Sequence, residues 1–222
     1  MPRISASSNA AQRENTKRAI LDSFGRLLYS KGLPGLTMTD VAKNAGIGRT
    51  AVYNYYADMG ELLVAYAMDE TDKFLEDLNG GLAGVTNPIE KLAVYIGLEI
   101  ERLSTHHTPP GPAMRSILSP EAFAKLGKHV SELQRVLSQI LSEAMMQGYI
   151  PENDIRAMAQ LVHGSLASSA DRTDEAPSAQ ARQEHINNTI RFIQMGLGAR
   201  FDANGNPVRL DGTLMPPLSA VS

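Results

Sequence analysis

The sequence contains no cysteine, so neither a disulfide framework nor a thiolate metal site can form. Tryptophan is also absent, and aromatic residues make up only 5% of the chain. No apolar segment approaches the roughly 20 residues that a membrane-spanning helix needs, and the first residues lack the apolar centre of a signal peptide. These absences fit a reducing compartment. We therefore predict a cytoplasmic protein with no membrane partner.

Positive charge is concentrated near the beginning of the chain. Residues 1–66 contain eight Lys or Arg and five Asp or Glu, whereas residues 67–222 contain thirteen and nineteen. Opposite signs in the two parts are expected if only the first part contacts a polyanion such as a nucleic acid.

Apolar residues recur with helical spacing along most of the chain, and no segment alternates as a strand does. We therefore predict an all-α protein, with a small N-terminal helical unit and a larger C-terminal helix bundle. The first helix is predicted to begin at Thr16, and the prolines of 104–112 (STHHTPPGP) predict a loop. The predicted parts are a disordered polar lead-in (1–15), a three-helix unit (16–60), a helical bundle (61–198) and an extended Gly/Pro-rich tail (199–222).

Residues 37–56, TMTDVAKNAGIGRTAVYNYY, predict two short helices joined by a tight turn. Thr37 is a typical N-cap, and Asp40 three residues later completes a variant capping box. Gly46 is expected in the left-handed conformation that ends the first helix. Two short helices with such a turn form a helix-turn-helix.

The second of these helices, predicted over about 49–56, has one apolar and one polar side. Val52 and Tyr56 are predicted to face the core. The exposed positions are Arg49, Thr50, Tyr53 and Asn54. Arginine can bind guanine, asparagine can pair with adenine, and threonine can contact a thymine methyl group when such a helix enters the major groove.

Phosphate contacts are expected from the same region. The hydroxyl groups of Tyr53 and Tyr55 suit phosphate oxygens. Thr37 and Thr39 begin a helix whose free N–H groups and positive dipole end attract anions. The spacing by itself leaves an alternative, because helical corners of this kind also occur as purely structural elements with tyrosines in the core.

Residues 20–63, ILDSFGRLLYSKGLPGLTMTDVAKNAGIGRTAVYNYYADMGELL, resemble the DNA-binding region of the tetracycline-repressor (TetR) family of bacterial transcriptional regulators. The resemblance rests on many positions at fixed spacing: Ile20, Leu21, Phe24, Gly32, Thr37, Val41, Ala42, Ala45, Gly46, Val52, Tyr53, Tyr56, Leu62 and Leu63. It implies phosphate support near Thr37 and DNA contacts from Arg49, Thr50, Ala51, Tyr53, Asn54 and Tyr55. Beyond this region the chain matches only in architecture, which implies a helical domain for ligand binding and dimerisation.

Three positions depart from the family pattern. The family often has a small hydroxyl residue at Gly48, a histidine at Tyr55, and a phosphate-binding lysine at Met59. With no lysine at Met59, DNA affinity is expected to depend more on Arg49 and on basic residues of the N-terminal arm. These arm residues are Arg13, Lys17 and Arg18.

The sequence offers no pattern for catalysis. None of the five histidines stands in the Glu-x-x-His or His-Glu-x-x-His spacing that places metal ligands on one helical face. There is no Walker-type phosphate loop and no serine elbow. We therefore predict no enzyme activity, no catalytic residue, no metal site and no cofactor.

Small residues in the segment LVHGSLASSA predict close approach of a second helix. Gly164, Ser165 and Ser168, with Ile186, Ile190 and Ile193 of the last helix, are predicted to form a four-helix interface about a two-fold axis. The resemblance implies the same dimer. The alternative is that these helices pack only within one protomer.

The effector site is predicted from the helices that line the cavity in the family. Its candidate residues are Tyr95, His106, Met114, Phe123, Met145, Met146 and His163. His106 is also explained as a surface-loop residue, and His163 as an interface histidine. Methionine suits adaptable apolar binding, so we expect an apolar or amphipathic small molecule.

Together these features predict a dimeric, ligand-released repressor that binds an inverted-repeat operator in double-stranded DNA. Two other classes are kept as alternatives: a helical small-molecule binding protein without a DNA function, and an all-α enzyme.

Overall fold

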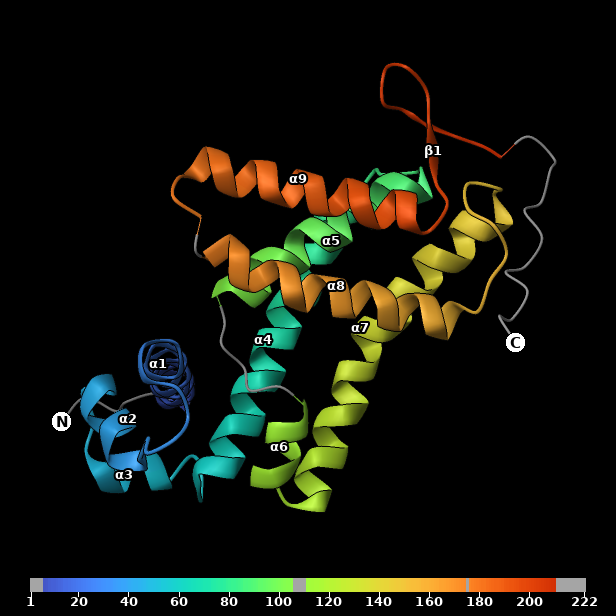
Figure 1. The fold of residues 1–222 in the computed structure, drawn as a ribbon. Helices are drawn as coiled ribbons and strands as arrows, with labels where there is room; N and C mark the ends of the chain where they lie inside the picture. Colours follow the sequence, from blue (N-terminus) through green and yellow to red (C-terminus); the bar gives the residue numbers. More distant parts are fainter. Residues whose placement is uncertain (1–5, 106–110, 175, 211–222) are drawn as a thin grey trace. The chain divides into compact units, whose positions relative to one another are not determined.

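The computed structural model describes residues 6–105, 111–174 and 176–210 (Figure 1). Within these residues it contains nine α-helices and one antiparallel pair of short strands, which confirms the all-α prediction. The helices are α1 (Ala6–Lys31), α2 (Met38–Ala45), α3 (Arg49–Tyr53), α4 (Met59–Leu82), α5 (Pro88–Thr105), α6 (Gly111–Ile117), α7 (Pro120–Met146), α8 (Ile155–Asp174) and α9 (Ala179–Gly196). The strands are β1 (Arg200–Phe201) and β2 (Pro207–Val208). Across the described ranges, no helix combines the length and the apolar character needed to cross a membrane.

The chain packs as two compact units. The first comprises the residues up to Thr71 together with the segment His106–His129, and the second comprises Asp72–Thr105 and the residues from Val130 onward. Helices α4 and α7 therefore contribute residues to both units. The functional division at residue 60 stays a prediction.

The core of the first unit is built from one side of each of its first four helices. Ile20, Phe24 and Leu28 recur every four residues along α1 and are fully buried, as the helical spacing predicts. The other fully buried residues here are Val41 of α2, Val52 of α3, and Leu62 and Leu63 of α4. The rings of Phe24 and Tyr66 meet edge to face at 5.4 Å between centroids, which joins α1 to α4.

The predicted start of the first helix was wrong. Helix α1 begins at Ala6, ten residues before Thr16, so much of the expected disordered lead-in is helical. Residues 6–15 contain neither glycine nor proline, and alanine, glutamine, arginine and glutamate are good helix formers. Nothing in the segment stops the helix from extending into it.

Two other segments also differ from the prediction. Helix α6 begins at Gly111 inside the predicted proline loop, because a proline at the second position of a helix lacks only an N–H that would have no partner there. The tail is not simply extended: Arg200 pairs with Val208, and Phe201 with Pro207, in a hairpin. Helix α3 ends at Tyr53, three residues before the predicted end.

In the second unit, α5 packs against α8 and α9. Its inward residues Leu92, Ile96 and Ile100 are fully buried, as predicted from their spacing. They share one apolar cluster with Leu137, Ile140 and Leu141 of α7, Val162 and Leu166 of α8, and Ile186 and Ile193 of α9. The buried amide of Gln194 donates to the carbonyl oxygen of Ile89 at 2.9 Å, which satisfies a polar group inside this cluster.

Candidate nucleic-acid interface and effector region

Helix α2 begins with the predicted capping box. The hydroxyl oxygen of Thr37 accepts from the N–H of Asp40 at 3.2 Å, and the Asp40 carboxylate accepts from the N–H of Thr37 at 3.0 Å. The hydrogen bond from the Thr37 hydroxyl, followed by the one from its backbone, lowers the pKa of Asp40. The Thr37 side chain is therefore engaged in the cap. Thr39 is exposed, and a phosphate contact there stays a prediction.

The turn between α2 and α3 depends on Gly46. This residue has φ 69° and ψ 27°, the left-handed conformation that the sequence predicted, and it lets the N–H of Ile47 bond the carbonyl of Ala42 at 3.0 Å. Gly48 then stands at the N-cap of α3 without a side-chain cap. The turn sets the direction in which α3 leaves α2.

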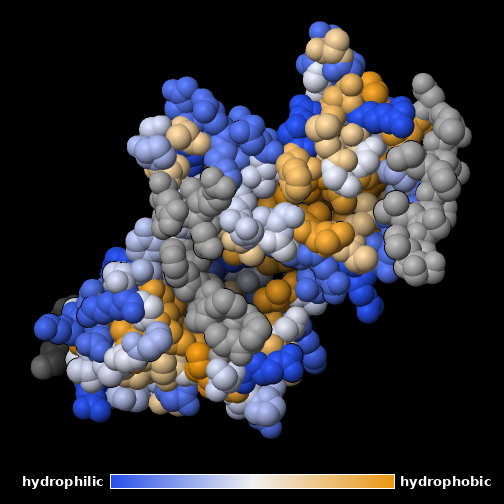
Figure 2. All heavy atoms as spheres, in the orientation of Figure 1, coloured by the Kyte–Doolittle hydropathy of each residue, from blue (hydrophilic) through white to orange (hydrophobic). Residues whose placement is uncertain are grey.

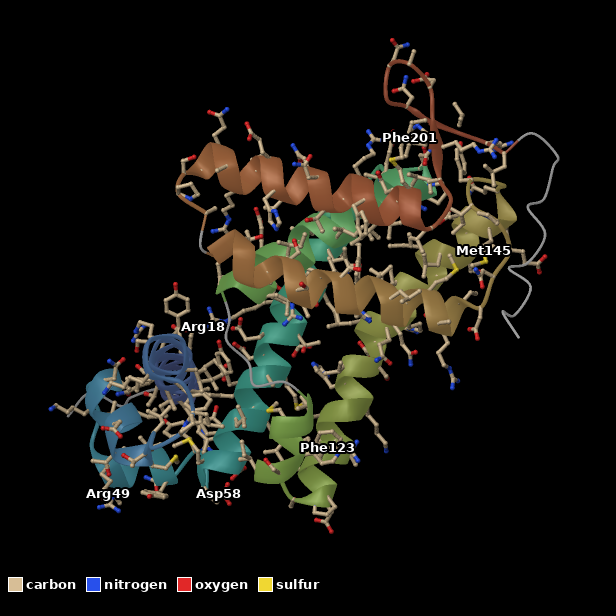
Figure 3. The ribbon with its side chains drawn as sticks, in the orientation of Figure 1. Arg18, Arg49, Asp58, Phe123, Met145 and Phe201 are labelled. Carbon is tan, nitrogen blue, oxygen red and sulfur yellow. The ribbon has the colours of Figure 1, made fainter. Side chains whose placement is uncertain are left out.

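Helix α3 has one buried side and one exposed edge. Val52 is fully buried and Tyr56, just beyond the helix, is 5% exposed, so both face the core as predicted. The predicted DNA-contacting residues Arg49, Thr50, Tyr53 and Asn54 are all exposed, and Ala51 and Tyr55 are half-buried. Figure 3 shows the Arg49 side chain projecting away from the helices. We call the four exposed residues the α3 edge.

The start of α4 carries acidic rather than basic side chains. Asp58 Oδ1 accepts from the N–H of Glu61 at 2.8 Å, so Asp58 caps the helix, and the Glu61 carboxylate accepts from the N–H of Ala57 at 2.7 Å. Met59, where the family often has lysine, is half-buried. This helix start therefore presents no cation to a phosphate.

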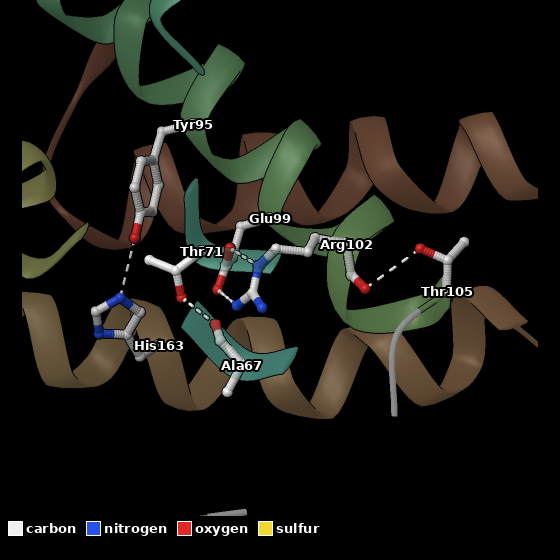
Figure 4. A network of polar contacts seen from close by, with 7 residues as sticks. All are labelled: Ala67, Thr71, Tyr95, Glu99, Arg102, Thr105 and His163. Atoms are coloured by element: carbon white, nitrogen blue, oxygen red, sulfur yellow. Dashed lines mark hydrogen bonds and ion pairs between the residues drawn. The ribbon is translucent and has the colours of Figure 1, made fainter. Parts of the chain in front are cut away.

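In the second unit, two predicted effector residues lie together. Tyr95 Oη and His163 Nε2 form a hydrogen bond of 3.1 Å between α5 and α8 (Figure 4). Tyr95 is fully buried, and its ring packs edge to face with the ring of Phe74. Burial raises the pKa of Tyr95 above its ordinary value, so the phenol stays protonated. Burial, which is opposed by Glu99 and assisted by Arg102, lowers the pKa of His163.

A buried ion pair, which the sequence reasoning missed, lies on the same helix α5. Arg102 donates to the two carboxylate oxygens of Glu99 at 2.8 and 2.6 Å, and its guanidinium lies 5.3 Å from the ring centre of Phe74. The Glu99 side chain is 6% exposed. The signal was a carboxylate that directly precedes Ile100 in an otherwise apolar stripe. A buried carboxylate of this kind requires a partner within the protein, because an isolated buried charge is costly.

The other predicted effector residues divide between the two units. Met114 and Phe123 belong to the first unit, where Arg115 lies 4.7 Å from the Phe123 ring centre. Met145 belongs to the second unit and packs against its apolar cluster. Met146 is 78% exposed, and its place at an effector site stays a prediction. His106 lies outside the described residues.

The predicted dimer residues fall into two groups. Ile186 and Ile193 are buried in the apolar cluster of their own protomer and Ile190 packs against it, so the isoleucines of α9 do not form an outer face. Their spacing fits either side of a helix, and the packing against α5 decides which side is buried. Gly164 and Ser168 are exposed and Ser165 is half-buried, along a groove between α8 and α9.

That groove is bordered by large apolar side chains that the sequence reasoning did not select. Leu161 is 71% exposed and Phe192 is 70% exposed, and both line the groove. Inside it, the Ser169 hydroxyl lies 2.8 Å from His185 Nε2 and 2.8 Å from the Thr189 hydroxyl. Figure 2 shows apolar atoms at the surface over α8 and α9. Single exposed apolar residues are common, but a pair beside small residues is typical of an interface.

Comparison with known proteins places the helix-turn-helix in a family. Residues 20–66 match the model of the bacterial regulatory proteins of the tetR family. The helix-turn-helix region of the chain therefore belongs to this family. The curated fatty acid metabolism regulator protein of Bacillus subtilis is 21% identical over 152 residues, which cover 66% of this chain and 77% of that protein.

Solved structures share the fold. The transcriptional regulator FadR from Bacillus subtilis, in complex with stearoyl-CoA, superposes with a TM-score of 0.67 at 19% identity, covering 81% of this chain and 98% of FadR. AibR, in complex with isovaleryl coenzyme A and operator DNA, gives a TM-score of 0.66 at 19% identity, covering 80% of this chain and 97% of AibR. The TetR-family assignment confirms the prediction of a DNA-binding transcriptional regulator.

One prediction follows from the hydrogen-bonded pair Tyr95 and His163. Because burial lowers the pKa of His163 in the folded protein, the unfolded chain binds a proton more readily. The free energy of unfolding should therefore decrease as the pH falls below about 6.5, the ordinary value for histidine. His163→Gln keeps a polar partner for Tyr95 and removes the titration, so its urea unfolding should depend less on pH. Equal pH dependence in the wild type and the variant would contradict this account.

Proposed function

We propose that this TetR-family protein is a homodimeric repressor that binds an inverted-repeat operator and is released from it by a small amphipathic effector. The observation that carries the proposal is the α3 edge, where four polar residues are exposed on a helix whose other side is buried. Because its target would be bacterial DNA, the protein is proposed to act in the cytoplasm.

The chemistry of the α3 edge suits base recognition. Arg49 stands in the first turn of the helix, which is the part that reaches base edges in a helix-turn-helix. Asn54 and Thr50 add an amide and a hydroxyl for further base or phosphate contacts. Tyr53 is 43% exposed and presents a rigid hydroxyl. The edge therefore combines base recognition with phosphate contacts.

Dimerisation is assigned to the groove between α8 and α9. In a two-fold dimer each patch contacts its own copy, so an apolar projection and a shallow groove on one face complement each other. Phe192 supplies the projection, and Gly164 and Ser168 supply the low surface beside it. Such a dimer presents two α3 edges to successive major grooves, about 34–36 Å apart.

The effector is assigned to the second unit. Apart from the apolar cluster, its interior holds the Tyr95–His163 hydrogen bond and the Glu99–Arg102 ion pair, which offer polar partners beside apolar walls (Figure 4). An amphipathic molecule matches that combination. The acyl-CoA ligands of the similarly folded FadR and AibR support acyl thioesters as the class to test.

Base recognition by Arg49 is tested by Arg49→Ala. This change should weaken operator binding by about 1–3 kcal/mol and relax selectivity at one base pair. Fluorescence anisotropy with operator variants measures both effects. The exposed Arg156 of α8 provides a control, since Arg156→Ala removes the same charge far along the chain and should leave binding unchanged. Equal weakening on all sequences would make Arg49 a phosphate contact instead.

The dimer is tested by Phe192→Glu. A charge placed in a desolvated contact should weaken dimerisation by about 2 kcal/mol or more, and sedimentation velocity should then show monomers. Met146→Glu is the matched control, because Met146 is equally exposed but lies on α7. A Phe192→Glu protein that remains dimeric would exclude this face.

The effector class is tested by adding stearoyl-CoA, isovaleryl-CoA or coenzyme A alone to the protein–operator complex. An acyl-CoA should lower operator affinity by about tenfold, and operator DNA should lower acyl-CoA affinity by the same factor. Coenzyme A alone is the control. No effect from either acyl-CoA would exclude this class.

A further inference from the structure

A groove of about 450 Å³ in the first unit lies between the early turns of α1 and the end of the helix-turn-helix. Its lining residues are Ala10, Arg13, Glu14, Lys17, Tyr55 and Tyr56. Tyr55 directly follows Asn54, so the groove borders the α3 edge. The groove exists because α1 continues to Ala6, which is ten residues longer than the spacing predicted.

One residue that lines the groove, Tyr56, has a buried hydroxyl without a partner among the described residues. The residue as a whole is 5% exposed. A buried hydroxyl without a partner costs free energy, and native proteins rarely keep one. Phenylalanine would fill the same space in the core without that cost. A partner that arrives from outside the chain accounts for the hydroxyl.

The hydroxyl is a donor under ordinary conditions. Burial, followed by the nearby carboxylates of Asp69, Glu14 and Glu61, raises the pKa of Tyr56 to about 12. The phenol therefore stays protonated at neutral pH and can donate to an anion.

The charged side chains that line the groove have a net positive charge, and the carboxylates of Asp69 and Glu61, which lie near Tyr56, are not part of the lining. Arg13 and Lys17 contribute two positive charges and Glu14 contributes one negative charge. Lys17 and Glu14 are 4.0 Å apart and largely exposed, so they neutralise each other only weakly. The guanidinium of Arg13 lies 5.6 Å from the ring centre of Tyr55, a cation–π contact that holds it at the mouth of the groove.

We infer that this groove binds a backbone phosphate of duplex DNA, with Arg13 and Lys17 supplying the charge and Tyr56 donating a hydrogen bond. The inference rests on the proposed function. A helix in the major groove has the phosphates of the two strands on either side, so a basic groove that borders the α3 edge is placed to receive one. It supplies the phosphate contact that the acidic start of α4 does not.

The experiment compares Tyr56→Phe and Arg13→Ala with wild-type protein, using operator and unrelated duplexes over a series of salt concentrations. Each variant should bind all duplexes about tenfold more weakly, since a phosphate contact carries no sequence information. Arg13→Ala should also reduce the slope of log K against log salt by about one. Lys31→Ala is the control, because Lys31 is an exposed cation on the same helix outside the groove lining.

Thermal unfolding separates this role from a structural one. Tyr56→Phe should have a melting temperature equal to or above that of the wild type, because it removes a buried hydroxyl that lacks a partner. A lower melting temperature with unchanged DNA binding would show a purely structural tyrosine and overturn the inference.

Other outcomes are equally decisive. If the wild type binds operator and both variants bind as tightly as the wild type, or if Lys31→Ala weakens binding as much as Arg13→Ala, the inference fails while the proposed function stands. Calorimetry with inorganic phosphate distinguishes a DNA phosphate from a free anion. Variants that lose binding of inorganic phosphate but keep wild-type affinity for DNA would overturn the inference, because the groove would then bind a free anion. A wild-type protein that binds no duplex would overturn both proposals.

Discussion

The burial of Val52 and Tyr56 is the interaction on which the proposed DNA-binding surface depends. A helix of five residues is not stable by itself, because nucleation costs more than so few hydrogen bonds return. Its position is therefore set by the two side chains that it buries and by the turn at Gly46 that directs it. Without that anchoring, the α3 edge would have no fixed geometry to present to a groove.

The same constraint explains the neighbouring features. The capping box at Thr37 fixes where α2 begins, and the left-handed Gly46 fixes where it ends. Tyr56 then has two roles in this account: its ring belongs to the core, while its hydroxyl, which has no partner among the described residues, is proposed to bind a DNA phosphate. The anchoring residue thereby connects the stability of the unit with its affinity for a polyanion.

The second unit follows a different principle. Its interior is mainly apolar, but it keeps a hydrogen bond and an ion pair whose partners satisfy each other. Such buried polar groups contribute little net stability, and a ligand that rearranges them can change the packing of the helices that carry them. Helices α4 and α7 each contribute residues to both units.

Features that depend on neighbouring residue types could be predicted from the sequence. The capping box at Thr37, the turn at Gly46 and the buried side of α3 follow from residue types a few positions apart, and the structure agrees.

Features set by tertiary packing could not be derived in this way. Tyr95 and His163 were each selected, but a bond across 68 positions has no local signature. The prediction that the isoleucines of α9 face a partner protomer was wrong. Their spacing fits either side of the helix, and only the packing against α5 decides which side is buried. The early start of α1 was missed because a polar segment suggested disorder, although it contains no helix breaker.

The central claim is that two α3 edges read DNA as a symmetric pair. Selection of bound duplexes from a random oligonucleotide pool by the purified protein tests it most directly. The account predicts enrichment of an inverted repeat whose half-sites lie about one helical turn apart, 10–10.5 base pairs between centres, or a multiple of it. Recovery of an unrepeated site, or no enrichment at low salt, would contradict it.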